Sequence, residues 1–150
     1  MSLELQVMAE MKEAMKSKDE ASLRALRAIK AEIIKAKTEP GAGGEISADK
    51  ELSMLQKMMK QRKDSLEIYQ QQNREDLSKK EREEMVVIEK FLPQQLSVDE
   101  LKAELQQIIL ETGASSPADM GKVMGAATKK LAGRADGKTV STMVKELLAK

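Results

Sequence analysis

The strongest constraint on this 150-residue chain is its hydrophobic pattern, which repeats with a helical period almost from end to end. Apolar residues recur three and four positions apart. No stretch of four or more residues shows the clean alternation that is typical of a half-buried strand. Proline and glycine interrupt the pattern at a few places, most clearly over residues 38–46 and at Pro93. The sequence therefore predicts an all-α fold.

Residues 1–93 are predicted to form an N-terminal region of four helices. The first two cover about residues 3–16 and 20–37, and Pro40 with the glycines after it prevents the second from continuing. A long third helix from about 47 to 73 and a fourth that ends at Pro93 then form a long hairpin. We expect the fourth helix to begin at a capping box of Ser78 and Glu81. The residues expected to face inward on the second helix are Leu23, Leu26, Ile29 and Ile33. Leu5, Met8 and Met15 lie close to one face of the first helix, the third helix has a heptad-like seam of Leu52, Leu55, Met59, Arg62, Leu66 and Tyr69, and the fourth carries Met85, Ile88 and Leu92. Arg62 on this seam is either an ion-pair partner of another helix or the edge of a groove.

Residues 94–150 are predicted to form a compact domain of three helices. A capping box of Ser97 and Glu100 begins the first helix, and Gly113 ends it. Pro117 begins the second, because proline suits the first position of a helix. The loop 133–138 precedes the third. The residues expected to face inward are Leu101, Leu105, Ile108, Met120, Val123, Met124, Ala127, Leu131, Val140, Met143, Val144 and Leu147.

The composition removes several kinds of chemistry, because the chain has no histidine and no cysteine. It therefore lacks the residues for the usual zinc sites, for a thiolate nucleophile and for a Ser-His-Asp triad. The carboxylates of Glu81, Glu83 and Glu84 are expected to form a solvated helix face, where burial would not raise a pKa. We predict no catalytic residue, no metal and no cofactor. The frequent charges in the first 20 residues favour neither a signal peptide nor a membrane span, so we expect a cytoplasmic protein.

Two glycine motifs need interpretation. Gly133 and Gly137 enclose three residues, whereas a phosphate-binding P-loop has four and follows a strand. We predict instead a turn in which Gly133 ends one helix and Asp136 or Thr139 caps the next. Gly121 and Gly125 are four residues apart on one helix, which favours the close approach of another helix or of a partner's backbone.

Charge is unevenly distributed, although the totals are 26 basic and 25 acidic residues. Residues 121–138 contain five basic residues and one acidic residue, a net charge of +4. Such a surface can contact phosphates, and the near absence of aromatic residues argues against single-strand binding by base stacking. The sequence thus indicates either a surface for a folded, double-helical nucleic acid or a solvated basic face. A secondary basic patch in the second helix comprises Arg24, Arg27 and Lys30.

Several segments resemble the GatB/YqeY-type family, most specifically residues 119–125, 130–138 and 144–148, and upstream residues 23–27, 60–66, 74–77 and 91–97. The C-terminal half is similar to the tail domain of the B subunit of the glutamine-dependent tRNA amidotransferase, a helical domain that contacts tRNA. That tail commonly has Asn-Pro where this chain has Asp136-Gly137. The resemblance implies tRNA contacts at Lys122, Gly125, Lys129, Lys130, Gly133, Arg134 and Lys138.

We therefore predict a non-catalytic accessory protein that binds tRNA. One alternative is an amidotransferase-like carbon–nitrogen ligase with glutamine as the amido donor, or a subunit of such an enzyme. In the related amidotransferase that chemistry belongs to a larger catalytic domain. The second alternative is a helical protein-interaction module that binds a protein partner through methionine-rich faces, which adapt to varied surfaces. Exposure of Met54 or Met58 would favour this alternative.

Overall fold

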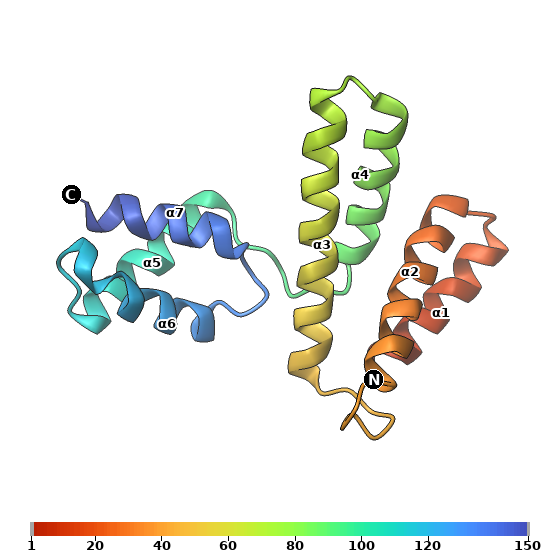
Figure 1. Ribbon diagram of the computed structural model, residues 1–150, viewed down its shortest axis with the longest axis horizontal. Helices are drawn as coiled ribbons and strands as arrows, with labels where there is room; N and C mark the ends of the chain where they lie inside the picture. Colours follow the sequence, from red (N-terminus) through yellow and green to blue (C-terminus); the bar gives the residue numbers. More distant parts are fainter. Residues whose placement is uncertain (1, 150) are drawn as a thin grey trace. The chain divides into compact units, whose positions relative to one another are not determined.

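A computed structural model describes residues 2–149, and Figure 1 shows that its regular elements are all helical within that range. The all-α fold predicted from the sequence is confirmed. None of the described helices is both long and apolar enough to span a membrane. The chain divides into an N-terminal unit, residues 1–92, and a C-terminal unit, residues 93–150. The elements are α1 (Leu3–Lys16), α2 (Glu20–Lys37), α3 (Ala48–Gln71), α4 (Glu75–Glu89), α5 (Val98–Thr112), the short 3-10 helix η1 (Pro117–Asp119), α6 (Met120–Lys130) and α7 (Gly137–Leu148).

The N-terminal unit consists of two helical pairs. Helix α1 packs on α2, α3 packs on α4, and the contact of α2 with α4 joins the pairs (Figure 1). The predicted inward face of α2 is confirmed, since Leu23, Leu26, Ile29 and Ile33 are all buried. A fully buried leucine or isoleucine contributes about 1.5–3 kcal/mol, so these positions hold the helical pairs together.

The apolar face of α1 noted in the sequence is not the face that packs on α2. Leu5, Met8 and Met15 are exposed, and the buried residues of the helix are Leu3, Val7 and Ala14, with Met11 half-buried beside them. Helix α1 carries two apolar stripes at helical spacing, and only one of them can face α2. The contact with α2 buries the stripe that begins at Leu3.

The long α3–α4 hairpin is present, but its second helix begins earlier than predicted and ends at Glu89, before Pro93. Asn73 adopts a left-handed conformation with φ 57°, and the N–H of Arg74 donates to the carbonyl of Tyr69 at 2.8 Å. Helix α4 then begins at Glu75, so Ser78 lies inside the helix and is fully buried. The capping box expected at Ser78 and Glu81 is therefore absent, because the tight turn lets the chain become helical one turn sooner.

The inward face of α3 follows the predicted seam in part. Leu55 is buried, and Leu52, Met59, Arg62, Leu66 and Tyr69 are half-buried. Met54 and Met58 are also buried, in the core with Leu55. The exposure of Met54 or Met58 that would favour a protein-interaction module is therefore not observed on this helix. On α4, Ile88 is buried, and Met85 and, just beyond it, Leu92 are half-buried.

The C-terminal unit is a three-helix arrangement of α5, α6 and α7 around one core (Figure 1). The predicted capping box is confirmed, with Ser97 Oγ accepting from the N–H of Glu100 at 3.1 Å and the Glu100 carboxylate accepting from the N–H of Ser97 at 3.2 Å. Gly113 ends α5 with φ 71°, as predicted. The buried residues are Leu101, Leu105, Ile108, Val123, Ala127, Leu131, Val140, Val144 and Leu148, with Met120, Met124, Met143 and Leu147 partly buried against them.

Candidate nucleic-acid interface

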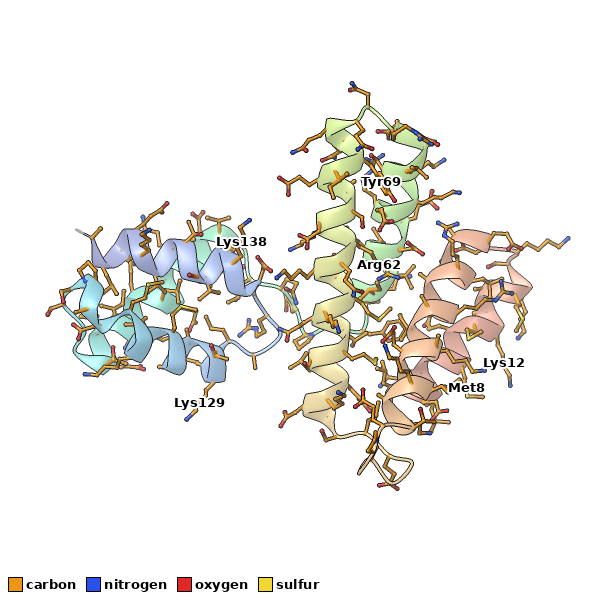
Figure 2. The ribbon with its side chains drawn as sticks, in the orientation of Figure 1. Met8, Lys12, Arg62, Tyr69, Lys129 and Lys138 are labelled. Carbon is orange, nitrogen blue, oxygen red and sulfur yellow. The ribbon has the colours of Figure 1, made fainter. Side chains whose placement is uncertain are left out.

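Three of the predicted contact residues share one face of α6. Val123 and Ala127 are buried in the core, whereas Lys122, Gly125 and Lys129 are exposed. At about 100° per residue, these three positions lie within about 60° of one another around the helix, opposite the core side. Figure 2 shows the Lys129 side chain projecting away from the body of the C-terminal unit. We call Gly121, Lys122, Gly125, Thr128 and Lys129 the α6 face.

The two glycines of the α6 face pack against nothing in the chain. A Cβ atom added at Gly121 or at Gly125 would meet no atom within 4 Å. The predicted close approach of another helix is therefore wrong within this chain, since α5 and α7 contact α6 through its other side. The glycines leave the helix backbone without side chains at two positions next to Lys122, and Gly125 lies between Lys122 and Lys129.

Lys130 points elsewhere, towards α5. Its Nζ lies 3.5 Å from Glu104 Oε2 and 3.9 Å from Glu111 Oε1, and all three side chains are well exposed. Exposed pairs of this kind are weak, about 0–1 kcal/mol, but the two carboxylates offset the charge of Lys130 locally. Lys122 makes one long hydrogen bond, from Nζ to the carbonyl of Thr112 at 3.4 Å. Lys129 makes no hydrogen bond or ion pair with any residue of the described range.

Gly133 and Arg134 hold the α6–α7 loop to the start of the unit. Gly133 is buried with φ 75°, and its carbonyl accepts from Gln95 Nε2 at 2.6 Å. The Arg134 carbonyl accepts from the N–H of Leu96 at 2.9 Å, and Arg134 Nε donates to the Gln94 carbonyl at 3.3 Å. These contacts assign both residues a structural role in the turn.

The cap predicted at Asp136 is confirmed, whereas α6 already ends at Lys130 with Leu131 as its C-cap, before Gly133. The Asp136 carboxylate disfavours an anion at the N-terminus of α7. Gly133 has a left-handed conformation within the loop after α6, and the Asp136 carboxylate accepts from the N–H of Thr139 at 3.2 Å. A carboxylate already occupies the positive end of α7, where it would repel a phosphate. Lys138 is exposed in the first turn of α7, and Figure 2 shows it on the opposite edge of the C-terminal unit from Lys129 in that view.

One residue of the secondary basic patch, Arg24, is held in ion pairs. Arg24 Nη2 lies 3.3 Å from Glu83 Oε2, and Arg24 Nε lies 3.5 Å from Glu84 Oε1. Glu84 also faces Arg62 of α3, whose Nη1 donates to the carbonyl of Met58 at 3.2 Å. Arg27 is exposed and Lys30 is half-buried. Arg24 is therefore part of a cluster that joins α2, α3 and α4.

The expectation that Glu81, Glu83 and Glu84 form a solvated face is wrong. All three are partly buried, and burial, followed by the neighbouring Glu84 carboxylate, raises the pKa of Glu81 above its usual value of 4.5. The arginines of α2 and α3 oppose this shift without cancelling it. The available signal in the sequence was Arg62 within an otherwise apolar seam, because a half-buried guanidinium requires an acidic partner. Within residues 2–149, no group of three or more acidic side chains is arranged to hold a metal ion.

Comparison with known proteins matches nearly all of the chain to one family. The sequence model of the Yqey-like protein family matches residues 4–148. A relative from Pyrenophora tritici-repentis (strain Pt-1C-BFP), named altered inheritance of mitochondria protein 41, mitochondrial, is 34% identical over 143 residues. That alignment covers 93% of this chain and 77% of the relative.

Proposed function

This chain belongs to the YqeY-like family, and from this premise we propose that it is a non-catalytic accessory protein that binds tRNA through the α6 face. One observation carries the proposal. Lys122 and Lys129 lie on the same helix surface as Gly121 and Gly125, and a Cβ added at either glycine would meet no atom within 4 Å. The similarity of the C-terminal half to the amidotransferase tail domain supports the same surface.

The chemistry of the α6 face suits a phosphate backbone. The ammonium groups of Lys122 and Lys129 supply charge without a fixed geometry, which is how lysine binds phosphate. Gly121 and Gly125 let a ribose–phosphate chain come close to the helix, because no side chain stands between them. With a single tyrosine and a single phenylalanine in the whole chain, recognition would depend on the shape and charge of a folded RNA.

The remaining predicted contacts have lesser roles in this proposal. Lys130 shares its charge with Glu104 and Glu111, and Arg134 and Gly133 build the turn, so we assign the primary contacts to Lys122, Gly125 and Lys129. We propose the cytoplasm as the compartment, in keeping with a chain that has no cysteine.

A binding titration tests the proposal. Purified bulk tRNA is titrated at low salt against the wild type and Lys122→Glu/Lys129→Glu. The matched control is Lys102→Glu/Lys145→Glu, which changes the same charge at exposed positions of α5 and α7. We expect the first variant to bind at least about tenfold more weakly and the control to lose clearly less. Equal loss in the two variants, or no tRNA binding by the wild type, would overturn the proposed surface. Conversion of Glu-tRNA to Gln-tRNA by the purified chain would overturn its non-catalytic part.

A further inference from the structure

Helix α1 carries an apolar stripe that nothing in the N-terminal unit covers. Leu5, Met8 and Met15 are 56%, 44% and 53% exposed, which is high for large apolar side chains. Lys12 lies in the same stripe, and Figure 2 shows Met8 and Lys12 side by side on the outer side of α1. We call Leu5, Met8, Lys12 and Met15 the outer stripe.

The outer stripe is separate from the face that packs on α2. At about 100° per residue, its centre lies about 140° around the helix from the buried stripe of Leu3, Val7 and Ala14. The core of the unit is complete without it, since Leu3 and Val7 are fully or almost fully buried. The outer stripe therefore contributes little to folding, and its apolar side chains stay available for a partner.

The spacing of the outer stripe is that of a helix–helix seam. Its residues follow one another at intervals of three, four and three, which are the alternating core positions of a coiled coil. A second helix that lies along α1 would place its own apolar side chains between these four. Two of the four are methionines, whose flexible side chains adapt to such a partner.

Charge defines the partner further. Lys12 makes no hydrogen bond or ion pair with a residue of the described range, and an acidic residue opposite it on the partner would complement its charge and fix the register of the two helices. Lys37 of α2 faces α1, because its Nζ lies 2.5 Å from Glu4 Oε2. Lys30 lies within about 20° of Lys37 around α2, so it places a second positive charge on the side of α2 that faces α1. Arg27 lies one turn before Lys30 on α2 and, like Lys30, pairs with no acid among the described residues.

We propose that the outer stripe docks an amphipathic helix of a partner protein, with an apolar seam and an acidic residue facing Lys12. The absence of tryptophan anywhere in the chain, and of any aromatic residue on α1, favours a helix over a lipid surface. This surface lies on the N-terminal unit and does not depend on tRNA binding by the α6 face.

The probe for this proposal is a synthetic, stapled 15-residue helix with leucine at its seam positions and a glutamate opposite Lys12. Its binding to the full chain is measured by fluorescence anisotropy. We expect Met8→Glu/Met15→Glu to weaken binding at least about tenfold. The control Val98→Glu/Leu110→Glu changes two apolar residues of the C-terminal unit that are 68% and 76% exposed, and it should bind as the wild type does. Circular dichroism establishes that every variant is folded.

Exchanging the charges of Lys12 and of the peptide residue opposite it tests whether these two residues face each other. Lys12→Glu should lose affinity for the glutamate peptide and regain it with a peptide that has lysine at that position, a recovery that misfolding cannot produce. The proposal is overturned if the wild type does not bind the peptide, or if Met8→Glu/Met15→Glu binds it as well as the control Val98→Glu/Leu110→Glu does. It is also overturned if the outer stripe instead mediates a dimer, seen by analytical ultracentrifugation as a dimer that Met8→Glu dissociates. Binding of anionic phospholipid vesicles in place of the peptide would overturn it as well.

Discussion

Arg62 of α3 and Glu84 of α4 face each other in the interior of the N-terminal unit, with 3.7 Å between Arg62 Nε and Glu84 Oε2. Only 15% and 14% of the two side chains are exposed. The other oxygen of Glu84 lies 3.5 Å from Arg24 Nε of α2. The Glu84 carboxylate therefore links three helices, and its low exposure leaves little room for water to solvate the charges if the ion pairs are lost.

Replacement of Glu84 by alanine is expected to lower the free energy of unfolding by about 3 kcal/mol or more. It leaves two guanidinium groups, one of them almost buried, without their shared partner, and breaking a buried pair typically costs about 3–5 kcal/mol. Urea denaturation followed by circular dichroism measures the change. The control is Glu13→Ala, which removes an ion pair with Lys16 whose side chains are 71% and 75% exposed, and it should cost less than about 0.5 kcal/mol. Similar costs in the two variants would show that Glu84 is solvated after all.

Replacement of Glu81 by glutamine should stabilise the chain at pH 7 and have no effect near pH 4. Burial raises the pKa of Glu81 in the folded state, so the Glu81 carboxylate binds a proton more tightly in the folded chain than in the unfolded chain. Ionised Glu81 therefore lowers stability above its folded-state pKa, and this cost disappears as the pH falls below the unfolded value of about 4.5. Urea midpoints of the variant and the wild type at the two pH values measure it. A variant less stable than the wild type at pH 7 would contradict the assigned direction.

Ser97 and Ser78 were both predicted to cap helices, and they should respond oppositely to alanine. Ser97 Oγ accepts from the N–H of Glu100, so its loss should cost about 1 kcal/mol. Ser78 Oγ is buried and has no hydrogen-bond partner among the described residues, so Ser78→Ala removes an unsatisfied polar atom and should be neutral or stabilising. Thermal unfolding compares the two variants, and a larger loss for Ser78→Ala than for Ser97→Ala would contradict the structure.

Local signals explain what could be predicted of the fold. The capping box at Ser97 and the stop at Gly113 depend only on neighbouring residues, and so do the turn at Gly133 and the cap at Asp136. Each was found from the sequence because the residue types and the backbone conformation are linked within a few positions.

The predictions that were wrong depend on contacts between helices or on a backbone turn, which the local sequence pattern does not determine. Helix α1 has two apolar stripes, and the packing of α2 selects the one with Leu3 and Val7. The start of α4 was misplaced because the left-handed turn at Asn73 allows helix formation before Ser78. The partners of Glu84 lie on helices far away in the sequence, and no spacing within α4 indicates them.

The candidate interface could be predicted by composition and only partly by geometry. The excess of basic residues over 121–138 indicates the basic segment from the sequence alone. It does not indicate that Lys130 lies near Glu104 and Glu111, or that Arg134 donates to a backbone carbonyl. Helical periodicity places Lys122, Gly125 and Lys129 on one side of α6. The open space at the glycines is visible only in the folded unit.

The salt dependence of tRNA binding tests the central claim most directly. If Lys122 and Lys129 contact phosphates, the logarithm of the association constant falls linearly with the logarithm of the salt concentration. Replacing both residues by methionine, which keeps the length of the side chains, should then make the slope shallower by about 2, close to 1 for each lysine. Lys102→Met/Lys145→Met, with the same loss of charge away from the α6 face, should keep the wild-type slope. Equal slopes for the wild type and Lys122→Met/Lys129→Met would contradict the claim that the α6 face binds the tRNA backbone.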